Sequence, residues 1–409
     1  MRITVAVLFG GKSVEHEVSV ISAVQAMQNI DEETYEIVPV YLTKGNEMYT
    51  GAGLREMDSY RDIPALLKGC TRVAFVVDGD KTFLMPSPPP RLHRRGGTLI
   101  DVAFPIVHGT NVEDGALQGM LRCLNLPFVG PDVLAAACTM DKFVMKTMLK
   151  QGGFPVLDGL RFSIAEQEDI DAIRAAVEGA FSYPVIVKPV NLGSSVGIGK
   201  ADDAEGLETC LRTAFSFARH VLVEPAITHL REINCAVLGD ADEAEASECE
   251  EPFMTEEILS YADKYEGGSG SGKAKGASDG PSGGKSGMAG LKRRIPAEIT
   301  AETRDHIRRL AVDAFQYLDC AGVTRVDFLQ DTLTGEIWIN ELNTIPGSLA
   351  FYLFEPLGIS YTELLTRLIQ LALKRARFEE DIVYSFDSNI LALAGGGAKG
   401  GKAGGGAKR

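Results

Sequence analysis

The first 130 residues alternate apolar strand patterns with helical patterns, and this alternation limits the possible folds more than any other feature. Continuous apolar runs at 3–9, 35–42, 73–77 and 102–107 predict strands, and the apolar spacing of 18–29 predicts a helix. Strands that alternate with helices usually form a mainly parallel sheet, because parallel neighbours need long crossover connections. The sequence therefore predicts an α/β fold that begins with a Rossmann-like parallel sheet.

The chain is long enough for more than one hydrophobic core. Its 409 residues divide by pattern into three predicted domains, over 1–130, 131–223 and 224–389. Two glycine-rich segments stand apart, a loop at 266–290 and a tail at 390–409, and we expect no regular structure in either. A long loop inside a compact domain is often an active-site lid, and we expect this role for 266–290.

The charge of the chain argues against several classes of partner. The formal net charge is −15 at pH 7, so a nucleic acid and an anionic membrane surface would both be repelled. The sequence shows no signal-peptide layout and no apolar run near the roughly 18 residues that a membrane span needs. We therefore expect a cytoplasmic protein that binds small molecules, with no nucleic-acid or membrane partner.

A lysine lies on an apolar strand in the middle of the chain. The run 184–189 contains Lys188, and a Gly/Ser loop follows at 191–199. A buried lysine needs an anionic partner, because desolvation disfavours an isolated charge. Glycines let backbone N–H groups face a phosphate, and Ser194 and Ser195 would add hydroxyl donors. The segment predicts a nucleotide phosphate site, whereas a surface turn after an edge strand would leave Lys188 unexplained.

A second polar cluster lies near the C-terminus, where two apolar strands at 324–329 and 337–343 predict a hairpin. Three side chains with oxygen atoms alternate with its apolar residues: Asp327, Glu341 and Asn343. Such oxygen ligands suit Mg²⁺ or Mn²⁺ beside nucleotide phosphates. Arg325 would share this face and could hold a carboxylate or a developing oxyanion. An exposed polar face of a hairpin explains the pattern equally well, so both interpretations stay open at this point.

Three further segments bear on the site. His108 follows a predicted parallel strand, at the sheet edge where ligands usually bind. Gly347 offers a backbone N–H, and Ser348 is predicted to begin a helix, whose free N–H groups attract anions. A hairpin is also predicted over 232–239 and 244–251, with acidic residues alternating with small ones, as on a solvent-exposed strand face.

Together these segments resemble the D-alanine–D-alanine ligase family of the ATP-grasp superfamily. The resemblance extends to about residue 389, and the motifs follow the family's order at 8–20, 108–119, 140–142, 187–197, 263–265, 325–327 and 340–347. It implies a three-domain ATP-grasp fold, with 131–223 as the central subdomain and 224–389 as the C-terminal domain. The chain departs from the family in lacking a glycine just before Glu113 and a Thr/Ser-rich run after Gly347.

The resemblance implies contacts with ATP and metal. Lys142 and Lys188 would contact the phosphates, Glu224 and Ile227 would line the adenine pocket, and Glu232 would bind the ribose. Further nucleotide contacts are implied for a smaller group: Ser194, Ser195 and Lys264. Two Mg²⁺ or Mn²⁺ ions would be held by the three oxygen-bearing side chains of the hairpin: Asp327, Glu341 and Asn343.

The resemblance also implies contacts with the amino-acid substrates. Glu15 would take the ammonium of the first D-alanine, helped by a link to Ser194 and Tyr265. Arg325 and the Gly347 amide would stabilise the oxyanion. His108 would lie near the first D-alanine, and Ser348 is the candidate for the substrate carboxylate in place of the missing Thr/Ser-rich run.

The implied reaction forms D-alanyl-D-alanine for peptidoglycan precursors through an acyl phosphate, and the implied assembly is a homodimer. Tyr265 favours an amino acid as the second substrate, because family members that make D-alanyl-D-lactate lack this tyrosine. The alternatives are a D-alanine–D-serine ligase, another ATP-grasp carboxylate–amine ligase, and a non-catalytic nucleotide-binding protein. The last would be expected to have lost one of four residues that are present here: Arg325, Asp327, Glu341 and Asn343.

Overall fold

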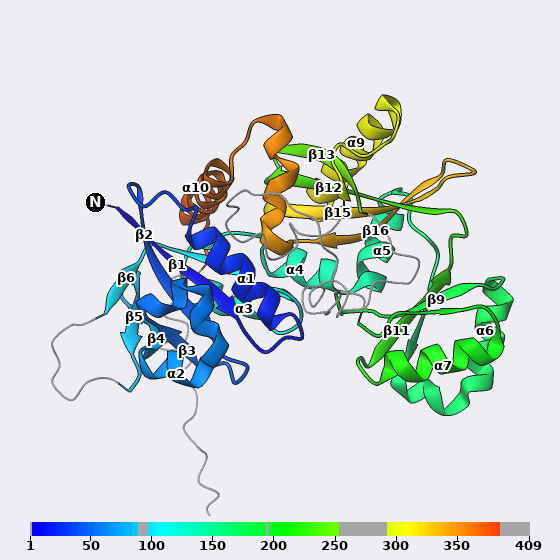
Figure 1. Cartoon of the computed structure of the whole chain (residues 1–409), viewed down its shortest axis with the longest axis horizontal. Coiled ribbons are helices and arrows are strands. Elements are labelled where there is room, and N and C mark those ends of the chain that lie inside the picture. Colours follow the sequence, from blue (N-terminus) through cyan, green and yellow to red (C-terminus); the bar gives the residue numbers. More distant parts are fainter. Residues whose placement is uncertain (1, 89–96, 194–195, 253–292, 385–409) are drawn as a thin grey trace, which may run out of the picture.

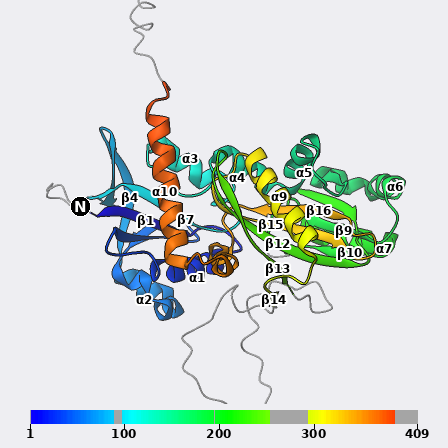
Figure 2. The same cartoon turned by 90° about the horizontal axis from the view of Figure 1, so that it is seen from above.

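The computed structural model describes residues 2–88, 97–193, 196–252 and 293–384. Within these ranges the chain forms three β-sheets, of seven, four and five strands. The five-stranded sheet lies between the other two along the long axis of the molecule, as Figures 1 and 2 show from two directions. The predicted α/β class is confirmed. Several predicted features lie outside the described residues: Ser194, Ser195, Lys264, Tyr265, the loop 266–290 and the tail 390–409.

The seven-stranded sheet is mixed. Its described strands follow the spatial order β6 (Thr98–Ile100), β5 (Lys81–Pro86), β4 (Thr71–Asp78), β3 (Met48–Thr50), β2 (Tyr35–Leu42), β1 (Ile3–Gly10) and β7 (Val102–Ile106). Strand β1 pairs in parallel with β2 and β7, whereas the pairs from β2 to β6 are antiparallel. The prediction of a mainly parallel sheet is therefore wrong for this half. The connections at 43–47 and 79–80 are too short for a crossover, so they join antiparallel neighbours.

Helix α1 (His16–Met27) follows β1 and packs against it, which confirms the helix predicted over 18–29. Its first residues place Glu15 at the N-cap position, directly beyond the end of β1. Four short helices also accompany this sheet in the sequence: η1 (Ala52–Arg55), η2 (Met57–Asp62), α2 (Ile63–Lys68) and α3 (Ala116–Cys123). Because β1 and β7 are parallel neighbours, their carboxyl ends lie at the same edge of the sheet. Glu15 and His108, which follow these two strands, line one cavity there.

The four-stranded sheet has the order β10 (Gly199–Ala201), β9 (Val185–Pro189), β11 (His220–Pro225) and β8 (Leu160–Ser163). Three helices belong to it, η3 (Ile164–Asp169), α6 (Ile170–Ala180) and α7 (Ala204–Phe215). Leu207, Leu211 and Ala214 are buried on one face of α7, as their spacing requires. Asp203 caps this helix by accepting a hydrogen bond from the Gly206 N–H, so burial and capping together fix α7 on the sheet.

Two further helices lie between the first and second sheets in the sequence, α4 (Val133–Met140) and α5 (Lys142–Gln151). Asp141 separates them in an extended conformation and accepts hydrogen bonds from the N–H groups of Phe143 and Val144. This N-cap ends one helix and starts the next. It places Lys142 in the first turn of α5, with its side chain turned toward the interior.

The five-stranded sheet has the order β14 (Arg293–Arg294), β13 (Ala244–Pro252), β12 (Leu230–Gly239), β15 (Gly322–Asp331) and β16 (Ile337–Asn343). Both predicted hairpins, β12–β13 and β15–β16, are confirmed. The exposed face predicted for 244–251 is wrong, because Glu248 is 7% exposed and Glu250 only 2%. Helix α9 (Ala301–Tyr317) packs on β13, and β14 covers its edge, so this strand lies inside the molecule.

The last described helix, α10 (Tyr361–Glu380), returns to the first sheet. Leu364, Leu365 and Leu368 share one hydrophobic core with residues of β1 and β7, and Figure 2 shows α10 passing over these strands. Arg375 lies over the ring of Phe128, with 4.5 Å to its centroid, and donates a hydrogen bond to the Phe128 carbonyl. Two short helices precede α10: η5 (Gly347–Leu353) and η6 (Glu355–Leu357). The two ends of the described chain are thus packed together.

Among the described residues, no helix is both long enough and apolar enough to cross a membrane.

Candidate active site where the three sheets meet

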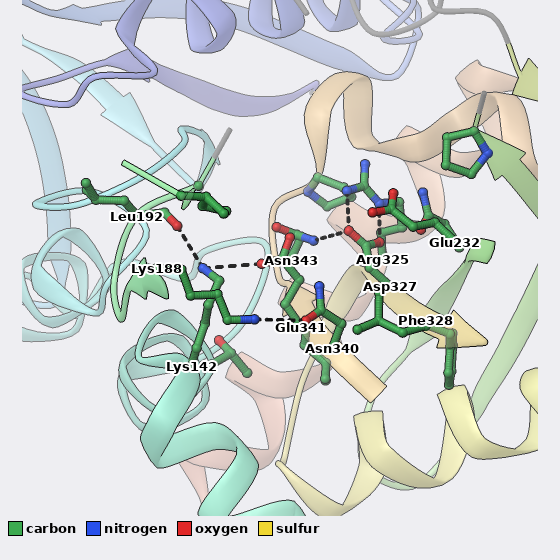
Figure 3. A pocket seen from close by; sticks show the side chains of 18 of the residues that line it. Lys142, Lys188, Leu192, Glu232, Arg325, Asp327, Phe328, Asn340, Glu341 and Asn343 are labelled. Carbon is green, nitrogen blue, oxygen red and sulfur yellow. Dashed lines mark hydrogen bonds and ion pairs between the residues drawn. The ribbon is translucent and has the colours of Figure 1, made fainter. Parts of the chain in front are cut away.

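A cavity of about 400 Å³ lies where residues of the three sheets converge. Its lining includes twelve of the predicted site residues: Glu15, His108, Lys142, Lys188, Glu224, Ile227, Glu232, Arg325, Asp327, Glu341, Asn343 and Gly347. Figure 3 shows the polar part of this lining, with lysines facing the acidic and amide side chains of β15 and β16. Ser348 is 1% exposed and does not line the cavity formed by the described residues.

The buried lysine of β9 has an anionic partner, as its position requires. The Lys188 ammonium lies 2.5 Å from Oε2 of Glu224, on the neighbouring strand β11, and 3.1 Å from Oδ1 of Asn340. Lys146 of α5, which the sequence did not reveal as part of the site, also pairs with Glu224. All three charged side chains are at most 6% exposed, so they form a buried triad of two lysines and one carboxylate.

Burial and mutual attraction shift the pKa values of Glu224 and Lys146. Burial opposes ionisation of Glu224, but the two lysines outweigh it and hold the pKa of this carboxyl below its usual range. Burial lowers the pKa of Lys146 to about 8, against the attraction of Glu224.

Lys146 could have been predicted as a site residue from its spacing. It lies one helical turn after Lys142 on α5, so the two side chains share one face of the helix.

Lys142 connects the α5 helix to the loop after β9 and to the acidic hairpin. Its ammonium donates to the Leu192 carbonyl at 2.7 Å and lies 3.2 Å from Glu341 Oε2. Burial would raise the pKa of Glu341, but the nearby Lys142, Lys188 and Arg325 charges hold it below its usual range. Glu341 is therefore ionised at neutral pH, and two lysine side chains lie on one side of it.

Arg325 and Asp327 occupy one face of β15, two residues apart. Their side chains form two hydrogen bonds, from Nε to Oδ1 and from Nη2 to Oδ2, both 2.6 Å long. On β16, Asn343 lies opposite Arg325 and Glu341 lies opposite Asp327. The Asn343 amide also donates to Asp327 Oδ2 at 3.0 Å. The four side chains therefore face one another inside the cavity, and the alternative of an exposed hairpin face is wrong.

The donor set of this hairpin fits a magnesium or manganese ion. Two carboxylates and one amide supply hard oxygen ligands, while Lys142 and Lys188 can neutralise phosphate charge beside them. Among the described residues, no three His, Cys, Asp or Glu side chains form a closed metal cage. Magnesium does not need one, because it is commonly held by one or two carboxylates together with substrate phosphates.

Glu15 lies in a narrow space between two glycines. A Cβ at Gly193 would lie 2.9 Å from Glu15 Oε2, and a Cβ at Gly109 would lie at the same distance. Real Cβ atoms essentially never approach another heavy atom so closely, so a side chain at either position would displace the Glu15 carboxylate. Gly109 also has a φ of 82°, which favours glycine for a second reason. The structure thus places Glu15 between the first sheet and the loop that follows β9.

His108 and Glu113 both line the cavity, and both are hydrogen-bonded to the backbone of Ile345. The His108 ring contacts the Ile345 carbonyl through Nδ1 at 2.8 Å and Ser22 Oγ through Nε2 at 3.2 Å. Glu113 accepts the N–H of Ile345 at 3.0 Å and that of Gly109 at 2.9 Å. Burial lowers the pKa of His108 to about 4, so the ring is neutral at pH 7. Burial raises the pKa of Glu113 to about 8, although the Gly109 N–H opposes this shift.

A further polar cluster was missed because β13 was predicted to be exposed. Glu250 lies 3.0 Å from Arg293 and accepts hydrogen bonds from Asn234 at 3.0 Å and from the Tyr352 hydroxyl at 3.3 Å. The Arg293 guanidinium also lies over the Tyr352 ring, 4.1 Å from its centroid. Asn234, Glu250 and Arg293 line the cavity. Together they add a buried charged group beside Arg325.

Comparison with known proteins agrees with this geometry. The family described as D-ala D-ala ligase N-terminus matches residues 4–131, and the D-ala D-ala ligase C-terminus matches 148–277 and 286–370. The D-alanine–D-alanine ligase of Thermosipho melanesiensis is 33% identical over 392 residues, which cover 96% of this chain and 99% of the relative. D-alanine–D-alanine ligase A of Escherichia coli is 39% identical over 383 residues, with 91% and 96% covered.

Solved structures show the same fold. VanG D-Ala:D-Ser ligase from Enterococcus faecalis superposes with a TM-score of 0.73 at 29% identity, covering 91% of this chain and all of its own. The D-alanine–D-alanine ligase from Coxiella burnetii superposes with a TM-score of 0.71 at 27% identity, covering 93% and 96%. The predicted ATP-grasp fold is confirmed. Since family matches, full-length relatives and fold all agree, this chain belongs to the D-alanine–D-alanine ligase family.

Proposed function

We propose that this protein joins two D-alanines to D-alanyl-D-alanine at the expense of ATP, for peptidoglycan precursor synthesis. The observation that carries the proposal is the convergence of four different groups on one cavity. These are a carboxylate for an ammonium (Glu15), a pair of lysines for phosphates (Lys142 and Lys188), a guanidinium for an oxyanion (Arg325), and the oxygen-bearing side chains of the β15–β16 hairpin for metal ions. An ATP-dependent carboxylate–amine ligase needs all four.

The nucleotide would lie at the β9 and β11 side of the cavity. Apolar side chains there, including Ile186 and Ile227, suit an adenine ring, and Glu232 lines the same cavity within reach of a ribose. The ammonium groups of Lys142 and Lys188 would bind the phosphates. Glu224 holds Lys188 in place, so its carboxylate supports the phosphate site in addition to lining the adenine pocket. Ser194, Ser195 and Lys264 remain proposed nucleotide contacts.

The reaction needs no nucleophile from the protein. The carboxylate of the first D-alanine attacks the γ-phosphorus, ADP leaves, and an acyl phosphate forms. The amine of the second D-alanine then attacks the acyl carbon, loses a proton, and expels inorganic phosphate. Glu15 would hold the first ammonium with the help of Ser194 and Tyr265. Arg325 and the Gly347 N–H would stabilise the oxyanion.

Asp327, Glu341 and Asn343 would hold two Mg²⁺ or Mn²⁺ ions, which supply positive charge to the phosphates when bound. Chelation with EDTA should then stop phosphate release, and added Mg²⁺ or Mn²⁺ should restore it. Glu341→Gln should raise the Mg²⁺ concentration needed for half-maximal rate at least tenfold, because it removes an ionised ligand. An unchanged Mg²⁺ dependence would contradict the assignment of Glu341.

The test of the proposed function is phosphate release from ATP and Mg²⁺ with D-alanine, D-serine, D-lactate and L-alanine, alone and in pairs. Products are identified by mass. Release with D-alanine alone, giving the dipeptide, is the expected result. Absence of release with every D-amino acid would refute the proposed substrate. A depsipeptide as main product near neutral pH would refute the role given to Tyr265.

A D-alanine–D-serine ligase is the second candidate. It is favoured by the similarity to VanG, whose own description names D-Ala and D-Ser. Preferential formation of the mixed dipeptide when both amino acids are present would establish this alternative.

We further propose that the protein acts in the cytoplasm as a homodimer, with domains at 1–130, 131–223 and 224–389. Light scattering of the purified protein would test the dimer, since a monomer has a mass of 44.0 kDa.

A further inference from the structure

We infer that Ser22, His108 and Glu113 are positioning residues that fix the backbone of 345–348, and with it the Gly347 amide, relative to the first sheet. The inference rests on the proposed function, in which that amide binds the oxyanion. It adds Ser22 and Glu113 to the residues on which the reaction depends, and it changes the role of His108.

Both backbone groups of Ile345 are held by side chains from the first sheet. Its N–H donates to Glu113 Oε1 at 3.0 Å, and its carbonyl accepts from His108 Nδ1 at 2.8 Å. Glu113 and His108 lie more than 230 positions earlier in the sequence, so these bonds join the loop after β7 to the segment after β16. The peptide groups on either side of Ile345 therefore cannot rotate freely.

Ser22 of α1 connects this group to the residue after Gly347. Its Oγ accepts the N–H of Ser348 at 3.0 Å and lies 3.2 Å from His108 Nε2. One set of proton positions satisfies every contact. His108 Nδ1–H donates to Ile345, the Ser22 hydroxyl donates to His108 Nε2, and Ser22 Oγ accepts from Ser348. This set requires a neutral imidazole, in agreement with the burial of the ring.

The segment that these side chains hold is strained. Ser348, Leu349 and Ala350 have φ values of 51°, 53° and 49°, a left-handed run that residues with a side chain rarely adopt. Such strain persists only where the surroundings over-determine the backbone. The bonds to Ile345 and Ser348 lie on the two sides of Gly347, so they supply that restraint at the place where the amide must point into the cavity.

His108 has both ring nitrogens bonded to protein groups, so it positions the backbone and does not exchange protons with a substrate. Ser22 does not line the cavity formed by the described residues, so it can affect the reaction only through other residues. This makes Ser22 the most informative position for a test.

The experiment compares Ser22→Ala and Glu113→Gln with the parent protein. Steady-state phosphate release with D-alanine and ATP–Mg²⁺ should show kcat lowered at least tenfold, with KM for ATP within threefold of the parent. Glu113→Gln replaces one accepting oxygen by an NH₂ group, so it can keep only one of its two bonds. Asp114→Asn is the matched control and should keep the parent rate, because among the described residues the Asp114 carboxylate accepts only from the nearby N–H groups of Asn111 and Ala116 and makes no bond to 345–348.

Hydrogen–deuterium exchange gives a readout that does not depend on activity. A peptide covering 343–350 should exchange at least tenfold faster in Ser22→Ala, while peptides from β12 and β15 keep the parent rate. Unchanged kcat and unchanged exchange in both variants would overturn the inference. Faster exchange throughout the protein would also overturn it, because the residues would then stabilise the fold as a whole. A parent protein that forms no dipeptide would overturn the proposed function, and this inference with it.

Discussion

The guanidinium of Arg325 and the carboxylate of Asp327 are joined side by side by two hydrogen bonds of 2.6 Å. Because one strand carries both groups on the same face, the pair is rigid and reaches the cavity as a unit. A bidentate pair fixes the plane of the guanidinium as well as its position. Arg325 can therefore present its remaining N–H donors in a defined direction.

Arg325→Lys should abolish most dipeptide formation, because an ammonium cannot reproduce the two-point pairing with Asp327. Loss of one oxyanion donor typically lowers kcat by about 10²–10³. Binding of ATP should change little, since Lys142 and Lys188 remain. Dipeptide formation and ATP binding by calorimetry measure the two effects separately. Arg304→Lys is the control, because Arg304 pairs with Asp305 on the surface of α9. Turnover equal to that of the parent would remove Arg325 from its assigned role.

Glu224→Gln should destabilise the folded protein, because it leaves two lysines buried with no carboxylate between them. Breaking a buried ion pair typically costs about 3–5 kcal/mol in the free energy of unfolding. Urea unfolding followed by circular dichroism measures the change.

The control for this variant lies on α5, the helix that carries Lys146 of the triad. Lys150 pairs with Asp158, but both side chains are about two-thirds exposed, at 65% and 66%. Lys150→Met should therefore change the free energy of unfolding by less than about 1 kcal/mol. Equal effects of the two substitutions would show that burial of the triad has no energetic consequence.

Gly193→Ala should displace Glu15, because the added Cβ would lie 2.9 Å from its Oε2. A displacement near 1 Å in a substrate-binding group can lower the rate by about 10²-fold. We expect KM for D-alanine to rise and kcat to fall, with stability nearly unchanged. Gly179→Ala in α6 is the matched control, since nothing lies within 4 Å of its added Cβ. If both alanine variants have the kcat and the KM for D-alanine of the parent, the close approach of Gly193 to Glu15 does not affect the reaction.

The contribution of His108 to the stability of the fold should be lost as the pH falls from about 6.5 toward 4. The pKa of His108 is lowered from 6.5 to about 4 in the fold, mainly by burial and further by Arg325. Between these values the unfolded chain binds more protons, so the stability from the neutral ring is complete above 6.5 and is lost on acidification. This contribution is on the order of 3 kcal/mol.

Urea unfolding at a series of pH values measures this loss, and His108→Asn is the comparison. Asparagine does not titrate, and its amide can still donate toward Ile345. The difference in unfolding free energy between parent and variant should therefore shrink between pH 6.5 and 4. A difference that stays constant over this range would mean that His108 is not responsible.

The local chemistry of the site was predictable from sequence because it depends on residue type and on short spacing. A lysine on the apolar strand β9 needed an anion, and the structure gives it Glu224 and places it in the cavity. The strands β15 and β16 were predicted as a hairpin with Arg325 and Asp327 on one face, and this is confirmed. Gly109 and Gly193 were recognised as members of sequence motifs. Only the structure shows why glycine suits both positions, because an added Cβ would lie 2.9 Å from the Glu15 carboxylate.

The register of the sheets could not be predicted, since a single extra residue turns every later side chain to the opposite face. A bulge in β15–β16 makes Asn340 the extra residue, so that Glu341 lies opposite Asp327 while Asn340 bonds to Lys188. A second irregularity, between Cys235 and Val237 of β12, brings Asn234 opposite Glu250. The Glu250 cluster was missed because the alternating acidic pattern of β13 predicted an exposed strand face, whereas Glu250 is buried.

The sequence by itself determined the strands and helices, the charged groups available for ATP and the family, because hydrophobic period and motif order are local properties. Tertiary structure alone decided which distant groups meet. Ser22, His108 and Glu113 come within hydrogen-bonding distance of 345–348 only because α10 and the segment before it pack on the first sheet. That packing depends on burial shared between residues hundreds of positions apart, and no local pattern in the chain records it.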